Sequence, residues 1–333
     1  MEFKIKLESF NPLVLLRLIL PFFFAKYLIA QLDFLYSFAN RSGYELSNTW
    51  INSFMPTRFI TFNDFDYLTY KYLILAFTIT AVIGFMGRIS LFILSMLCFI
   101  IVGSVEGLGA FDHHMSLSGQ IIFALSVLPS SMNFSFDRLI LNNMRAKKNR
   151  FILRGNVKWE VNLLLLMLAL TYFTAGLSKL RYSEGKWLDG STLGFYLEER
   201  TMDYPVGKQQ LLFGDANRQT DFSKDNYGFY SHTYGNYQNS RLLNNLIAWL
   251  SEHRYFLIFM SIATVLLELS GFVVFINERF RNVYLLSAIL MHLSIGFLMG
   301  LGFVNYRVIC LCLMEWKSLI KLHKDNFTFL QTK

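Results

Sequence analysis

The sequence has little charge, little proline and little cysteine. Only 16% of its 333 residues are charged and five are proline, whereas 54% are hydrophobic and 17% are aromatic. A soluble domain carries about 25% charged residues, and a disordered chain has far fewer aromatic residues than this one. Three cysteines, all within apolar runs, exclude a secreted disulfide scaffold and act as small buried side chains. These scarcities together indicate a membrane protein.

Common catalytic and nucleotide-binding motifs are missing as well. There is no phosphate-binding loop ending in Gly-Lys-Ser/Thr, no Gly-x-Gly-x-x-Gly after a strand, no His-Glu-x-x-His and no Gly-x-Ser-x-Gly. Nucleotide-driven transport and the commoner hydrolase reactions are therefore not expected.

Long apolar stretches dominate what is present, and they predict an all-α fold, a polytopic bundle of about eight membrane-spanning helices. The predicted spans are Pro12–Leu32, Thr69–Met86, Ile89–Ser104, Ser116–Met132, Trp159–Leu180, Tyr255–Ile276, Val283–Leu301 and Phe303–Trp316. Charges at Glu2 and Glu8, and at Arg17 and Lys26 within the first stretch, argue against a cleavable signal peptide.

The distribution of basic residues predicts the orientation of these spans. The connection 133–158 carries seven basic residues against a single acidic one, Asp137, so it should be cytoplasmic. Alternation then places both termini, including the tail 317–333, in the cytoplasm. The same rule accounts for the net charge of +8, so no nucleic-acid partner is expected.

One membrane domain covers residues 10–316 in this scheme, with a long polar segment on the extracytoplasmic side. This segment, 181–254, is rich in Tyr, Asn, Asp and Gly, too polar to span and too aromatic for plain disorder. Its length allows either a lid or re-entrant cap over the outer face, or an ordinary loop packed on the bundle.

Ionisable residues inside the spans are candidate functional or structural sites because burying a charge in a bilayer is costly. Arg17 and Glu268 lie at similar depths near the cytoplasmic ends of their spans, so we expect them to form a structural pair. Lys179 ends the fifth span near the outer surface. Helical spacing places Tyr172, Gly176 and Lys179 on one face, where the glycine lets a neighbouring helix approach closely. A desolvated lysine there can serve as a base, and an interfacial anchor is the alternative.

Three histidines complete the set of candidates. His113 and His114 follow Asp112 on the outer side, and their adjacent side chains point in different directions, so no metal site is expected. One of them could transfer a proton or orient a ligand. His292 lies in the middle of the seventh span, either as a site residue or as a hydrogen-bonded packing residue.

Several segments, in order, resemble one family. The most specific is Tyr172-Phe-x-Ala-Gly176-Leu-x-Lys179-Leu, followed by Trp187-x-x-Gly190. It resembles vitamin K-dependent γ-glutamyl carboxylase and its bacterial relatives, the HTTM (horizontally transferred transmembrane) proteins. Shorter matches over residues 10–315 are Leu15-Leu-Arg17, Gly84-x-x-x-Arg88, His114-x-x-x-x-Gly119-x-x-x-Phe123, Leu267-Glu268-Leu-Ser-Gly271-Phe272 and His292.

The resemblance implies a membrane enzyme of lyase type with its active face on the extracytoplasmic side. The residue matching Lys179 would deprotonate a reduced vitamin K-type quinone, and His114 would assist. Oxygen then converts the quinol into a base that removes a γ-proton from a peptide glutamate, carbon dioxide adds, and the quinone leaves as its epoxide. His113, Tyr172, Trp187 and His292 would line the quinone site, and Arg17, Glu268, Gly176 and Gly271 would be structural. The implied partners are the bilayer, a lipophilic quinone and a secreted peptide or protein.

Two departures keep a second function open. The family has paired lysines where this chain has Ser178-Lys179, and the large lumenal region of the animal carboxylase has no counterpart after Trp316. The alternative is a non-carboxylating HTTM protein that acts in maturation of, or immunity to, a secreted peptide. A transporter is disfavoured because the polar groups divide between Arg17 and Glu268 near the cytoplasm and Lys179 and His114 near the outside.

Overall fold

The computed structural model describes residues 11–39, 64–106, 115–145, 157–183, 185–201 and 240–316. All regular secondary structure in these ranges is helical, which confirms the predicted all-α class. The helices form two compact units, each assembled from separate parts of the chain. Unit 1 comprises Met1–Leu168, Phe272–Leu286 and Val304–Lys333, and unit 2 comprises Ala169–Gly271 and Ser287–Phe303.

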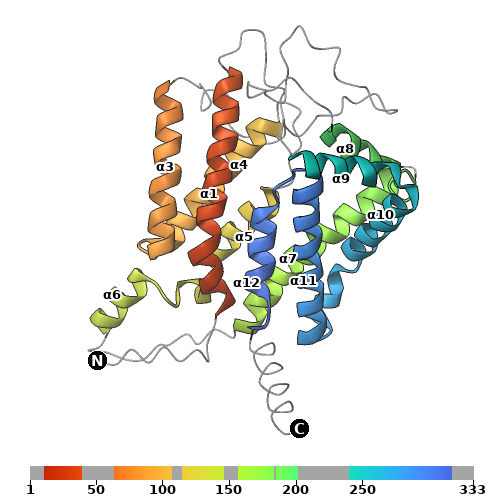
Figure 1. The fold of residues 1–333 in the computed structure, drawn as a ribbon. Coiled ribbons are helices and arrows are strands. Elements are labelled where there is room, and N and C mark those ends of the chain that lie inside the picture. The colour runs from red at the N-terminus through yellow and green to blue at the C-terminus, as the bar shows by residue number, and fades with distance from the viewer. Residues whose placement is uncertain are drawn as a thin grey trace. The chain divides into compact units, whose positions relative to one another are not determined.

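Unit 1 is a helical bundle in which α1, α3, α4 and α5 pack on one another, with α12 against α1 (Figure 1). Its helices are α1 (Pro12–Ala39), α3 (Asp64–Ile83), α4 (Gly87–Glu106), α5 (Ser116–Val127), η3 (Pro129–Met132), α6 (Phe136–Arg145) and α12 (Val304–Leu313). Leu16, Leu20, Phe24 and Leu28 recur every four residues along α1 and are fully buried, so one face of this helix lies in the core.

Unit 2 holds α8 (Ser191–Thr201), α9 (Arg241–Glu252) and α10 (Arg254–Leu269). The helices α7 (Val157–Tyr182) and α11 (Glu278–Leu298), and the 3₁₀ helix η5 (Gly271–Phe275), contribute residues to both units. A small core of Leu197, Ile247, Leu250 and Leu257 joins α8, α9 and α10. Both described ends of the polar segment 181–254 are thus packed helices, and its middle lies outside the described residues.

Five of the described helices are long and apolar enough to cross a membrane, and a sixth span results if the bent pair α9 and α10, which meet at 89°, is counted as one. The five are Pro12–Asp33, Asp66–Ile83, Gly87–Val105, Val157–Tyr182 and Glu278–Leu298. All eight predicted stretches overlap helices, but α5, α10 and α12 have 12, 16 and 10 residues, fewer than the roughly 20 that a bilayer core requires. The count of eight therefore stays a prediction.

Arg17 is buried in unit 1, where its guanidinium binds backbone carbonyls from three segments. It donates to Ser131 O at 2.9 Å, to Ala81 O at 2.9 Å and Val82 O at 2.8 Å, and to Phe134 O. The carbonyls at the end of α3 lack helical partners, so the arginine satisfies groups that would otherwise be buried without hydrogen bonds. Arg17 thereby ties α1 to the end of α3 and to the segment before α6.

Asp137, near the start of α6, caps α4. Its two carboxylate oxygens each accept a hydrogen bond of 2.8 Å, one from Met86 N–H and one from Gly87 N–H. Asp137 N–H in turn donates to Gly84 O at 3.0 Å. A carboxylate at a helix N-terminus satisfies unpaired N–H groups and suits the helix dipole. The start of α6 is therefore fixed to the turn between α3 and α4.

Candidate functional site

The C-terminal half of α7, which belongs to unit 2, carries the predicted polar face. Tyr172 and Gly176 are buried there, and Lys179 is half-buried in the last turn. The positions are four and three residues apart, so they recur on one side of the helix. This face meets α10 and α11.

Lys179 forms an ion pair with Glu268, which lies in the last turn of α10. Lys179 Nζ is 2.7 Å from Glu268 Oε1 and 2.8 Å from Oε2. The two side chains are 19% and 7% exposed, respectively. The carboxylate thus offers both oxygens to one ammonium group in a partly buried setting, where charge–charge interactions are stronger than in water.

Gly176 makes this pairing possible because it lets α7 and α10 approach closely. A side-chain carbon at position 176 would lie 3.0 Å from Glu268 Cβ and 3.2 Å from the Leu269 side chain. Gly271 has a similar role just after α10, where an added carbon would lie 2.8 Å from Ala169 O. Small residues at helix crossings serve the same purpose in other membrane proteins.

The loop after α7 places an aromatic ring beside the same lysine. Lys179 Nζ lies 5.1 Å from the centroid of the Trp187 ring, within the range of a cation–π contact. Ser183 organises the loop, since its hydroxyl donates to Lys179 O at 2.5 Å and accepts from Trp187 N–H at 3.4 Å. The structure thus brings together Lys179, Trp187, Gly176 and Glu268 of the predicted candidates.

The predicted pair between Arg17 and Glu268 is wrong. Glu268 binds Lys179, and Arg17 is satisfied by backbone carbonyls. The prediction assumed straight spans of full length and counted depth from their ends, whereas α10 ends at Leu269, seven residues before the predicted boundary. The predicted separation of Glu268 from Lys179 across the membrane is wrong for the same reason, and so this argument against a transporter fails.

A second buried polar contact links α7 to α11. Tyr172 Oη and His292 Nε2 share a hydrogen bond of 2.6 Å, and the ring of Phe303 lies 4.9 Å from the ring of His292. Both polar side chains are at most 5% exposed. His113 and His114 lie outside the described residues, so their roles stay predictions.

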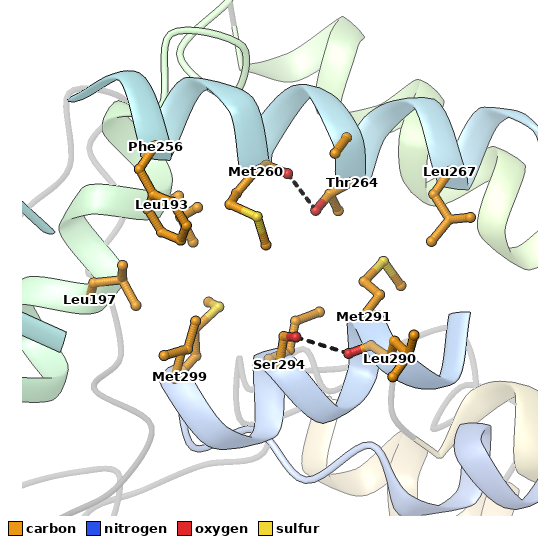
Figure 2. A pocket seen from close by; sticks show the side chains of 13 residues that line it. Leu193, Leu197, Phe256, Met260, Thr264, Leu267, Leu290, Met291, Ser294 and Met299 are labelled. Carbon is orange, nitrogen blue, oxygen red and sulfur yellow. Dashed lines mark hydrogen bonds between the residues drawn. The ribbon is translucent and has the colours of Figure 1, made fainter. Parts of the chain in front are cut away.

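An apolar cavity of about 240 Å³ lies between α8, α10 and α11 (Figure 2). Its walls include Leu193, Phe256 and Met299, and its only hydroxyls among the described residues are those of Thr264 and Ser294. Each hydroxyl donates to a carbonyl of its own helix, as the dashed lines in Figure 2 show. Its surface consequently suits a hydrocarbon group, and in the part of the chain that the structure describes neither Lys179 nor His292 lines it.

The comparison with protein families identifies the chain. The model of the HTTM domain matches residues 20–213, more than half of the sequence. The chain belongs to the HTTM family. The HTTM domain is the membrane domain associated with vitamin K-dependent carboxylase-like proteins, and with its apolar helices it makes this chain an integral membrane protein. No curated protein and no solved structure matches the chain.

The HTTM match includes only some of the residues of the candidate site. Tyr172, Lys179 and Trp187 lie within the matched range, whereas Glu268 and His292 come from α10 and α11 beyond it. Sequence reasoning named Glu268 but missed its partner, and it missed Ser183 and Phe303 altogether. The signals for Glu268 were its charge within an apolar run and its place in the short family match Leu267–Phe272.

Proposed function

We propose that this HTTM protein is a membrane-embedded enzyme of the vitamin K-dependent γ-carboxylase type. It would use a reduced naphthoquinone, oxygen and carbon dioxide to carboxylate glutamate in a secreted peptide, at a site facing the extracytoplasmic side, with both chain termini in the cytoplasm. The observation that supports this most is the Lys179–Glu268 pair, which joins a half-buried amine of α7, inside the HTTM match, to a buried carboxylate of α10.

Lys179 would act as the base. The ammonium would first pass its proton to water by way of the Glu268 carboxylate, whose Oε1 lies 2.7 Å away, and the neutral Nζ would then accept a proton from a quinol hydroxyl. Glu268 favours this transfer because its two oxygens lie where the positive charge develops, and the Trp187 ring adds a cation–π contact. General-base catalysis of this kind contributes about 10²- to 10⁴-fold to a rate.

The residues present fit a quinone. The cavity between α8, α10 and α11 would hold an apolar ring or chain, since its walls offer no unpaired hydroxyl among the described residues. Leu267 and Met291 line it, and they directly precede Glu268 and His292 in the sequence. When bound, the reduced quinone supplies, with oxygen, the strong base that glutamate deprotonation needs. His114 would orient the quinol, as the family resemblance implies.

Quinol-to-epoxide conversion in proteoliposomes tests the proposal. With Lys179→Ala we expect a loss of about 10²-fold or more, in line with removal of a general base. Glu268→Gln should also slow the reaction, because the neutral amide no longer stabilises the ammonium group. Lys186→Ala, a lysine in the loop after the same helix, is the matched control and should keep the wild-type rate.

Two results would overturn the proposal. If Lys179→Ala inserts, folds and converts quinol at the wild-type rate, the assigned base is wrong. If the wild-type protein converts no naphthoquinol, the enzyme assignment is wrong and the peptide-maturation or immunity alternative takes its place.

A further inference from the structure

The short helix α6 is amphipathic, and the described residues leave most of its apolar side uncovered, since only Phe136 meets another ring, that of Phe85 at 6.0 Å. Phe136, Leu139 and Ile140 lie at spacings of three and four residues, so they form one stripe along the helix. All three are exposed in unit 1, Leu139 to 58%. Arg138 falls on the opposite side of the helix by its spacing. We call Phe136, Leu139 and Ile140 the α6 stripe.

The attachment of α6 fixes the depth at which the stripe lies. The turn 84–87 joins α3 and α4, which are both long and apolar enough to cross a membrane, so the turn lies at a membrane surface. Asp137 binds this turn through Met86 N–H and Gly87 N–H, and Arg17 binds Phe134 O just before α6. Figure 1 shows α6 beyond the end of α3, running away from the bundle. The stripe is therefore held at the boundary between lipid and water.

The charge of this region indicates which lipids face it. The segment 133–158, which contains α6, has seven basic residues and one acidic residue. That acidic residue, Asp137, is engaged in capping α4. Helical spacing puts position 145, also an arginine, on the same side as Arg138. Basic residues beside an in-plane apolar stripe are typical of helices that bind anionic membrane surfaces.

We propose that α6 is an interfacial anchor that inserts its stripe into one leaflet and binds anionic lipid headgroups there. A partner protein would have to displace lipid from a stripe that already lies at the acyl boundary, so the bilayer is the occupant that the geometry favours. Because Asp137 and Arg17 connect α6 to α1, α3 and α4, lipid binding at α6 also supports the packing of unit 1. The inference does not depend on the proposed reaction.

Spin labels on α6 in vesicles test the insertion. We would replace the three native cysteines by alanine and label Leu139→Cys and Arg138→Cys separately in phosphatidylcholine–phosphatidylglycerol vesicles. The label at 139 should be accessible to oxygen and shielded from a water-soluble nickel complex, and the label at 138 should show the reverse. Equal nickel access at both positions would place α6 in water and overturn the proposal.

Lipid selectivity tests whether the basic residues of α6 bind anionic headgroups. It is measured on protein with its native cysteines. Spin-labelled phosphatidylglycerol should associate with the wild-type protein in preference to spin-labelled phosphatidylcholine. Arg138→Gln with Arg145→Gln should lower this preference by up to about 30-fold, the effect of two basic side chains at roughly 1 kcal/mol each near a membrane surface. The matched control is Arg181→Gln with Lys186→Gln, at and just after the C-terminal end of α7. This double variant should leave the lipid preference unchanged. An equal loss in both double variants, or no loss in either, would overturn the anionic-lipid assignment.

Discussion

Arg17 and Lys179 find their hydrogen-bond partners in different ways, and the chemistry of each side chain explains the difference. Arg17 has five N–H donors in a planar fork, and it reaches carbonyls of three separate segments. Lys179 is a compact point charge on a flexible stem, and a single carboxylate satisfies it. Arg17 therefore acts on the packing of unit 1, whereas Lys179 pairs with one side chain of unit 2.

Arg17→Lys should be strongly destabilising even though it keeps the charge. A lysine cannot reach carbonyls of all three segments, so buried carbonyls lose their donors, at a cost of about 1–3 kcal/mol each. We expect the free energy of unfolding in mixed micelles to fall by about 3 kcal/mol or more. The same substitution at exposed Arg181 should change it by less than about 0.5 kcal/mol. Equal unfolding midpoints for the two variants would contradict the role assigned to the Arg17 guanidinium group.

At the scale of elements, the loop from α7 to α8 explains the predicted motif Trp187-x-x-Gly190. Trp187 covers Lys179, and Gly190, with φ of +80°, begins the approach to α10. A side-chain carbon at position 190 would lie 2.8 Å from Ile258 N, so only glycine fits. Asp189 then starts α8 by accepting a hydrogen bond of 2.8 Å from Ser191 N–H.

The start of α8 should depend on pH through Asp189. Hydrogen bonds from the Ser191 side chain and backbone lower the pKa of the Asp189 carboxyl below its ordinary value of 3.8. The carboxylate therefore supports α8 fully above pH 3.8, and this support is lost as the pH falls through the lowered native pKa. Hydrogen exchange should show the first α8 amides losing protection, relative to the rest of unit 2, only in that acid range. With Asp189→Asn, protection should not change across the range, and a wild-type loss beginning near neutral pH would contradict the assignment.

Hydropathy predicted where helices form better than it predicted where they end or which other helices they contact. Apolar runs show where a helix can cross a membrane, but α5 stops before Pro129, which has no N–H to continue an α-helix. The contact between Lys179 and Glu268 joins residues 89 positions apart, and no periodicity in one helix reveals which other helix it will face. The spacing within α7 was predictable because it depends only on helix geometry.

At the scale of the whole molecule, contacts between the connecting segments agree with the membrane sides predicted for them. The basic connection 133–158 is predicted to be cytoplasmic, and alternation through the predicted spans puts the turn 84–87, next to Arg88, on the same side. Asp137 binds that turn directly. Asn282 at the start of α11 likewise binds Glu315 after α12. Each of these contacts joins segments that alternation puts on the same membrane face.

Reporter fusions should reveal this orientation in a bacterial host. Green fluorescent protein joined after Lys333 should fluoresce, since it folds in the cytoplasm, and alkaline phosphatase inserted between residues 202 and 239 should be active outside. Moving the two reporters to each other's positions should abolish both signals. Active phosphatase at the C-terminus would reverse the predicted orientation of the chain.

The order of biosynthesis determines when the Lys179–Glu268 pair can form. A ribosome that adds about 5–20 residues per second needs about 4–18 s to extend the chain by the 89 residues from Lys179 to Glu268. During that interval α7 enters the bilayer with a lysine whose carboxylate does not yet exist. The newly inserted helix must keep its amine at the lipid headgroups until α10 arrives, so the site is completed only late in synthesis. A chain truncated before Glu268 would therefore present an uncompensated charge to the quality-control machinery of the membrane.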